Sequence, residues 1–266
     1  MKFIGWDTSS SVGAIAVFEA SHGKIQLLSE WQLNVNAKQS ECLLWGIDAA
    51  LKAAKLVLEE MDFISVGDGP GSFTGLRIGL STARSFSQAL KKPVVLFNSL
   101  RVLLEPAITW SEIFLKNEDL LVVSAVDACK GEWYCLGGEV KNLKKEYRTS
   151  SLQSSDSYFC AGSPDQALTW LKERLRSNPK LKWIAVGNAV ERYPDLWNIE
   201  IERRYVIPSG FGHSVSGRFI GEGSLDIFEK TGGMTHSEVT PAYLRVPDAQ
   251  KRLESGELKS SFFQNR

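Results

Sequence analysis

Residue types that build metal sites are scarce in this chain of 266 residues. Histidine occurs three times, at His22, His213 and His236, and no two histidines are spaced to share one face of a helix. Paired imidazoles are the usual core of a catalytic zinc site, so we expect no metal. The four cysteines show no paired spacing either. We therefore expect reduced thiols in packing positions.

An excess of positive charge and a long apolar run are also missing. The chain carries 31 Lys and Arg against 31 Asp and Glu, a formal net charge of zero. A protein that grips nucleic acid alone usually shows a basic excess, so this class is disfavoured. No apolar run approaches the length of a membrane span. The first residues read as a strand rather than a signal peptide, and we expect a cytoplasmic protein.

The common phosphate-binding and nucleophile motifs are absent. A P-loop requires a Lys after its last glycine, and no Lys occurs between Lys55 and Lys91. No G-x-S-x-G elbow occurs, and Cys129 has no identifiable histidine partner. The dinucleotide fingerprint fails as well, because Thr74 stands where Gly or Ala is needed. Nucleophilic catalysis and the usual nucleotide loops therefore have no support.

The most informative stretch that is present is Gly-Asp-Gly-Pro-Gly-Ser-Phe-Thr-Gly-Leu-Arg-Ile-Gly at 67–79. An apolar run at 63–66 precedes it, and apolar residues recur at helical spacing after it. The glycines are therefore predicted to lie in a tight strand-to-helix turn. Ser72 or Thr74 can cap the following helix.

Small residues recur every fourth position along this helix, at Gly75, Gly79, Ala83 and Ser87. Such a ridge lets another backbone approach closely, at the cost of poor helix propensity. One interpretation is that a partner helix packs on the ridge, in which case Gly79→Leu would preserve the fold and abolish partner binding. The other is that the helix lies flat on its own sheet.

Strands and helices alternate in two similar halves. Strands are predicted at 2–7, 12–18, 25–35, 63–67, 94–97, 121–126, 132–140 and 183–187. Helices are predicted at 39–60, 75–90, 99–110, 164–176 and 216–230. The fold class is α/β, with two RNase H-like lobes of the actin and sugar-kinase type, each a mixed sheet with flanking helices. The expected division is an N-terminal lobe at 1–115, a C-terminal lobe at 120–247 and a polar tail at 248–266.

Each predicted lobe opens with a strand that ends in Asp. Asp7, followed by Thr8 and Ser9, resembles the first phosphate loop of actin-like ATPases, and Asp127 occupies the equivalent place in the second half. In those enzymes the carboxylate holds a metal-bound water. An Asp before Ser or Thr also commonly orders a turn by accepting backbone N–H groups. The loop after Asp7 lacks paired glycines and a basic residue, so we expect degenerate phosphate loops.

The stretch at 67–79 resembles the signature of the TsaB-type family of bacterial partner proteins in the threonylcarbamoyl modification of tRNA adenosine. Three further segments resemble this family in the same order: Asp-Thr-Ser at 7–9, Val-Asp-Ala at 126–128 and Pro-Ala-Tyr-Leu-Arg at 241–245. The resemblance spans residues 1 to about 247. Two positions depart from the family pattern, where Cys129 replaces a frequent Arg and Gln39 a frequent His.

The resemblance implies a non-catalytic partner of the tRNA threonylcarbamoyl transferase, and not an enzyme. Its catalytic relatives carry a metal on an H-x-x-x-H motif, which this chain lacks. The implied partners are the TsaD-type transferase and a TsaE-type ATPase, with tRNA met only through the complex and no cofactor. A different possibility is an ATPase or small-molecule kinase with a surviving cleft between Asp7 and Asp127.

The resemblance also implies that the first lobe binds its partner through two helices, in a four-helix arrangement. Without the partner this apolar face would stay exposed, so we expect a homodimer through the same helices. The helix at 39–60, the helix at 75–90 and the turn before the second helix would supply this face. The expected interface residues are Leu43, Leu44, Ile47, Leu51, Gly71, Ser72, Phe73, Thr74, Gly75, Leu76, Arg77, Gly79 and Ala83.

Overall fold

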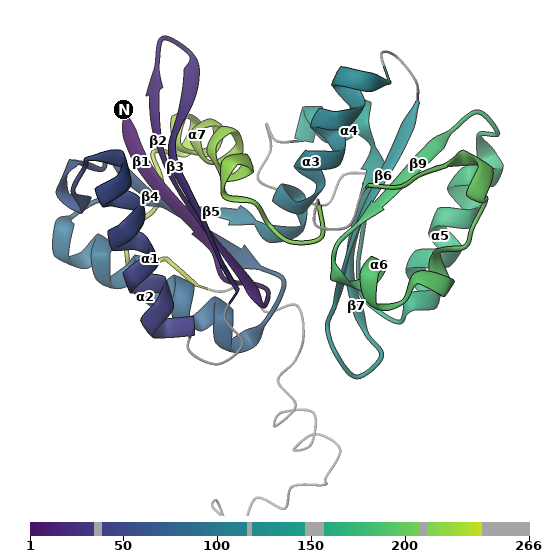
Figure 1. Cartoon of the computed structure of the whole chain (residues 1–266), viewed down its shortest axis with the longest axis horizontal. Coiled ribbons are helices and arrows are strands. Elements are labelled where there is room, and N and C mark those ends of the chain that lie inside the picture. The colour runs from purple at the N-terminus through teal and green to yellow at the C-terminus, as the bar shows by residue number, and fades with distance from the viewer. Residues whose placement is uncertain (35–38, 116–118, 147–156, 208–211, 241–266) are drawn as a thin grey trace, which may run out of the picture.

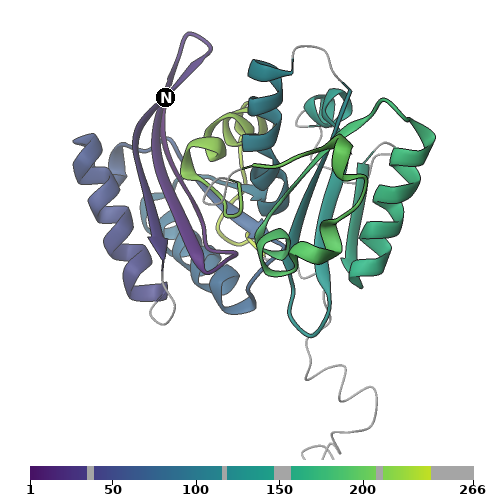
Figure 2. The same cartoon turned by 45° about the vertical axis from the view of Figure 1, so that its right-hand side comes forward.

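A computed structural model describes residues 1–34, 39–115, 119–146, 157–207 and 212–240. Its layers run from one helical pair, through a first sheet, a central helical layer and a second sheet, to an outer helix (Figure 1). Turning the molecule keeps the two sheets on opposite sides of the central helices (Figure 2). The predicted tail at 248–266 lies outside the described residues. None of the described helices combines the length and apolar character that a membrane crossing requires.

The two sheets have the same topology. The first has the order β3-β2-β1-β4-β5, and the second has the order β10-β9-β6-β7-β8. In each sheet the first strand of the lobe pairs antiparallel with the next strand and parallel with a later one. The strands are β1 Lys2–Asp7, β2 Val12–Ser21, β3 Lys24–Asn34, β4 Phe63–Gly69, β5 Val94–Asn98, β6 Leu120–Asp127, β7 Trp133–Glu139, β8 Ser157–Gly162, β9 Lys182–Val186 and β10 Arg204–Tyr205. This repeated arrangement confirms the predicted fold class of two RNase H-like lobes.

Helices cover both faces of each sheet because the strands are apolar on both sides. The first sheet has α1 and α2 on its outer face, while α3 and α7 lie between the sheets (Figure 1). The α-helices are α1 Gln39–Ala54, α2 Phe73–Leu90, α3 Ser99–Phe114, α4 Val140–Glu146, α5 Pro164–Ser177, α6 Asn188–Arg192 and α7 Ile220–Thr231. Short 3-10 turns occupy Leu58–Glu60, Pro194–Trp197, Ile201–Arg203 and Gly217–Phe219. The predicted helix at 39–60 is therefore interrupted, because Lys55 takes a left-handed φ of 57°.

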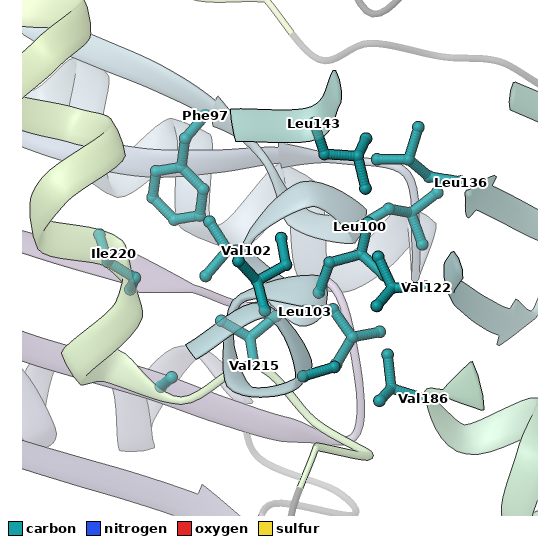
Figure 3. Packing of buried hydrophobic residues seen from close by; sticks show 14 of the residues in the cluster. Phe97, Leu100, Val102, Leu103, Val122, Leu136, Leu143, Val186, Val215 and Ile220 are labelled. Carbon is teal, nitrogen blue, oxygen red and sulfur yellow. The ribbon is translucent and has the colours of Figure 1, made fainter. Parts of the chain in front are cut away.

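The lobes share one core, which is built around α3. Leu100 and Leu103 of α3 face Val122 and Val186 of the second sheet, and Val215 joins the same cluster (Figure 3). All five side chains are at most 3 % exposed. A continuous apolar core makes the two lobes one packed unit.

The chain returns to the first lobe at its end. Helix α7 contacts β1, β2, β3 and β5, although the sequence at 216–230 was expected to complete the second half. Gly5 makes this packing possible, because a Cβ there would lie 2.6 Å from Cγ2 of Ile220. The buried hydroxyls of Ser65 and Ser224 hydrogen-bond across the contact at 2.6 Å. Sequence periodicity does not report such a crossover, since both partners lie far apart in the chain.

Candidate partner interface and the cleft between the lobes

The glycine-rich turn joins β4 to α2 in the predicted way. Ser72 caps α2, and its hydroxyl accepts the backbone N–H of Gly75 at 3.2 Å. The N–H of Ser72 donates to the carbonyl of Ser9 at 2.6 Å. At Gly71, a Cβ would lie 2.2 Å from that same carbonyl oxygen, so only glycine fits. The turn is thereby held against the loop that follows β1.

The small-residue ridge of α2 faces its own sheet. The hydroxyl of Thr8 donates to the carbonyl of Gly75 at 2.7 Å, and the indole N–H of Trp6 donates to that of Gly79 at 3.1 Å. A Cβ at Gly79 would lie 2.4 Å from Oγ1 of Thr8. Gly75, Gly79 and Ala83 are buried. Their predicted role in a partner interface is therefore wrong, and the interpretation of a helix lying flat on its own sheet is correct.

The apolar stripe of α1 is also buried within the lobe. Leu43, Ile47 and Leu51 are 2 %, 3 % and 6 % exposed and pack in one core cluster with Leu76 and the inner residues of the first sheet. These four residues do not reach a partner, which corrects the prediction for them. A stripe at helical spacing identifies the face that is buried, and here the molecule's own sheet buries it.

A different set of apolar side chains remains exposed on these helices. Leu44 and Trp45 of α1 are 52 % and 58 % exposed, and Phe73 of α2 is 44 % exposed. The guanidinium of Arg77 lies 3.9 Å from the Phe73 ring centroid, a cation–π contact. Trp45 meets Trp31 of β3 edge to face, with ring centroids 5.4 Å apart. We call Leu44, Trp45, Phe73 and Arg77 the α1/α2 face.

The topology brings these residues to one end of the lobe. Strands β3 and β4 run in the same direction, because each is separated from β1 by an even number of antiparallel pairings. Helices α1 and α2 follow those strands, start at the same edge of the sheet and lie next to each other (Figure 1). Sequence reasoning did not select Trp45 for the interface. The available signal was a large apolar residue outside the helical spacing of the buried stripe.

The first candidate phosphate loop uses its polar groups internally. Asp7 is fully buried and accepts the N–H of Ser9 at 2.9 Å and the hydroxyls of Ser9 and Ser99 at 2.6 and 2.5 Å. Burial raises the pKa of the Asp7 carboxyl, while the hydrogen bonds from Ser9 and Ser99 oppose the rise. Gly67 leaves the space that this carboxylate fills, since a Cβ there would lie 2.1 Å from Oδ2.

A second carboxyl lies beside this network. Oδ1 of Asp68 is buried and has no hydrogen-bond partner among the described residues. Burial, with the nearby charge of Asp7 as a smaller cause, raises the pKa of Asp68 to about 7. Sequence reasoning missed this residue, although it stands within the signature stretch. The described parts of the chain hold no cluster of three or more His, Cys, Asp or Glu side chains arranged for a metal ion.

Asp127 occupies the equivalent position in the second lobe. It accepts the N–H of Cys129 at 2.8 Å, just as Asp7 accepts that of the residue two positions on. Arg192 and Tyr193 also donate to Asp127, at 2.7 and 3.1 Å. The side chain of Asp127 is 3 % exposed, and its charge is balanced by Arg192.

The space between the two loops is small. A cavity of about 10 Å³ lies there, which is room for about one water molecule. Its polar lining includes Ser9, Ser99, Asn188 and His213, and its apolar lining includes Leu100 and Leu103 of α3. The N–H of Asp127 donates to the side-chain oxygen of Asn188 at 2.8 Å, which ties the second loop to α6.

Known proteins resemble this chain over most of its length. Residues 35–159 match the family described as TsaD, tRNA N6-adenosine threonylcarbamoyltransferase. The tRNA threonylcarbamoyladenosine biosynthesis protein TsaB of Buchnera aphidicola subsp. Schizaphis graminum is 27 % identical over 201 residues, which is 76 % of this chain and 85 % of that protein. TsaB of Escherichia coli is 26 % identical over 265 residues and covers 97 % of this chain and 100 % of its own length.

A solved structure agrees with these relatives. YeaZ from Pseudomonas aeruginosa superposes with a TM-score of 0.62 at 19 % identity and covers 91 % of this chain and 99 % of its own. That likeness concerns the fold. Taken with the two relatives, it makes this chain similar, over most of its length, to proteins named TsaB and YeaZ.

Proposed function

We propose that this chain is a non-catalytic subunit for the threonylcarbamoyl modification of tRNA adenosine, and that it acts by binding a TsaD-type transferase. Two relatives that match over 76 % and 97 % of this chain are named as biosynthesis proteins for this modification. The transferase binds tRNA and performs the chemistry, a TsaE-type ATPase joins the complex, and this chain meets tRNA only through the complex.

One observation carries the non-catalytic role. The loop that would hold phosphate in an actin-like ATPase instead braces α2: Thr8 bonds the carbonyl of Gly75, and Ser9 receives the N–H of Ser72. The carboxylate of Asp7 is buried under the Ser9 and Ser99 hydroxyls. The cavity that the described residues enclose beside this loop has a volume of only about 10 Å³, far smaller than a nucleoside triphosphate.

The α1/α2 face supports partner binding. Large apolar side chains exposed together mark protein interaction sites, and aromatic residues beside an Arg are typical centres of such interfaces. The transferase family matches this chain over residues 35–159, a range that contains both helices. Two proteins that share one lobe can pair through the same face about a pseudo-twofold axis. In this proposal residues 1–115 form the partner-binding lobe.

The test is binding of the purified transferase to the full chain and to Phe73→Glu. A buried charge at the centre of the interface should weaken binding at least about tenfold. Val57→Glu is the matched control, because Val57 is 55 % exposed in the same lobe beyond the far end of α1. Normal binding by Phe73→Glu, or equal loss in both variants, contradicts the proposed face.

Calorimetry with ATP and magnesium separates this proposal from the ATPase or kinase alternative. The proposal expects no heat of binding with the isolated chain. Saturable binding that disappears in Asp7→Asn would favour the alternative, in which the Asp7 loop still serves a nucleotide.

A further inference from the structure

Two cysteines stand directly opposite each other in the second sheet. Cys135 of β7 and Cys160 of β8 are register partners in an antiparallel pair. Directly opposed residues of such a pair have Cα atoms about 4.5 to 5.5 Å apart. A disulfide accepts Cα separations of about 4.4 to 6.8 Å. The backbone thus already holds the two residues at a distance that a disulfide can span.

The surroundings make the two thiols unequal. Cys135 is fully buried under α5, whereas Cys160 is only partly buried on β8, the last strand in the order of its sheet. The ring of Tyr158 stacks on Trp170 of α5 with centroids 4.6 Å apart. Trp170 comes this close because Gly137 has no Cβ, which would lie 2.8 Å from the indole. A small oxidant from solvent therefore meets Cys160 first.

The hydrogen bonds to Cys160 favour its thiolate. The neighbouring Cys135 thiol and Tyr158 hydroxyl lower the pKa of the Cys160 thiol, although burial opposes them. The same contact and burial raise the pKa of Cys135. The thiolate is the nucleophilic form of cysteine, so Cys160 is the attacking group and Cys135 the resolving group.

We propose that Cys135 and Cys160 form a redox-responsive dithiol, in which a hydroperoxide oxidises Cys160 and Cys135 then closes a disulfide between β7 and β8. This inference does not depend on the proposed function. Cys42 lies in α1 and Cys129 follows β6, so both serve as reference thiols within the same chain.

The step balances with hydrogen peroxide as the oxidant. The Cys160 thiolate attacks one peroxide oxygen, the O–O bond breaks, and the departing hydroxide takes a proton and leaves as water. Cys160 becomes a sulfenic acid. The Cys135 sulfur then attacks the Cys160 sulfur, the S–O bond breaks, and the leaving hydroxide takes the Cys135 proton. Two thiols lose two electrons, and one peroxide becomes two waters.

The test uses the full chain with Cys42→Ser and Cys129→Ser, treated with equimolar hydrogen peroxide and analysed by mass spectrometry. The expected product has lost the mass of two hydrogen atoms and yields a peptide that links Cys135 to Cys160. Reduction by dithiothreitol should restore both the mass and the separate peptides.

A resolving-cysteine variant gives the second readout. Adding Cys135→Ala should stop the reaction at the Cys160 sulfenic acid, which dimedone traps, while Cys160→Ser should leave Cys135 unmodified. Circular dichroism before treatment verifies that each variant is folded. The proposal is overturned if excess peroxide yields no linked peptide, or if Cys129 of the wild-type chain is oxidised faster than Cys160.

Discussion

At the scale of single residues, two carboxyl groups show how the cleft differs from an open catalytic site. Asp7 accepts three hydrogen bonds from Ser9 and Ser99, so its acceptor groups are occupied inside the molecule. Asp68 lies next to it, and its buried Oδ1 has no hydrogen-bond partner in the part of the chain that the structure describes. A buried carboxyl in this setting favours its neutral form, which makes the stability of the fold depend on pH.

Asp68→Asn should reduce the pH dependence of the free energy of unfolding. The pKa of Asp68 is raised from 3.8 to about 7 in the fold, so its ionisation costs stability progressively as pH rises from about 4 to about 7. Near pH 8 the variant should be more stable by about 1 to 3 kcal/mol, a range reduced from the full shift because Asp68 is partly exposed. Near pH 4 the two proteins should match.

Urea unfolding at both pH values measures this difference. Asp62→Asn is the control, because Asp62 is exposed and lies before β4 in the same lobe. An unchanged pH dependence in Asp68→Asn would mean that the buried carboxyl is ionised without cost.

At the scale of elements, helix α2 combines a buried ridge with an exposed aromatic end. The ridge accepts hydrogen bonds from Trp6 and Thr8 through the Gly79 and Gly75 carbonyls, so the helix lies unusually close to β1. The opposite side carries Arg77 and presents Phe73 at its first residue. The glycines therefore fix the position of Phe73 and Arg77 without belonging to the proposed interface.

Gly79→Leu should destabilise the fold by about 2 to 3 kcal/mol. Any side chain at this position collides with Thr8, and the gain in helix propensity of about 1 kcal/mol does not compensate for the displaced contact. Thermal unfolding measures the effect. Ser81→Leu, on the exposed side of the same helix, should change stability by less than about 0.5 kcal/mol. Equal stability of Gly79→Leu and wild type would contradict the burial of the ridge against the sheet.

Periodicity predicted this helix and its cap correctly but not the direction of its ridge. The spacing of Gly75, Gly79 and Ala83 indicates that another backbone packs closely on this face of the helix. The spacing is the same whether that backbone belongs to the chain's own sheet or to a partner helix. The stripe of Leu43 and Ile47 carries the same ambiguity. The exposure of Trp45 shows which face of α1 is open to a partner, but the sequence does not report that exposure, because it depends on the three-dimensional packing.

At the scale of the whole molecule, helix α3 joins the two lobes. Helix α3 contacts both sheets, and α7 brings the end of the chain back to the first sheet. The motifs around Asp7 and Asp127 predicted two equivalent lobes, since each motif repeats a strand and a turn. The return of α7 could not be predicted in this way, because it depends on contacts such as Gly5 with Ile220.

The isolated chain should form a homodimer through the α1/α2 face. Leu44, Trp45 and Phe73 are 52 %, 58 % and 44 % exposed on neighbouring helices, and pairing two copies about a twofold axis would remove this apolar surface from water. Sedimentation at high micromolar concentration should therefore give a dimer for wild type and for Val57→Glu, but a monomer for Leu44→Glu. A wild-type chain that stays monomeric at this concentration would contradict self-association through the α1/α2 face.

The central claim is tested most directly by reconstituting threonylcarbamoyl transfer to tRNA from purified components. The reaction contains the TsaD-type transferase, the TsaE-type ATPase, the enzyme that supplies threonylcarbamoyl-adenylate, and this chain as wild type, Trp45→Glu/Phe73→Glu or Asp7→Asn. The account predicts no product from this chain alone, full activity of the mixture with wild type, and at least about a tenfold loss with the double variant. It also predicts that a folded Asp7→Asn chain supports the reaction. Full activity with the double variant, or loss of activity in a folded Asp7→Asn chain, would contradict it.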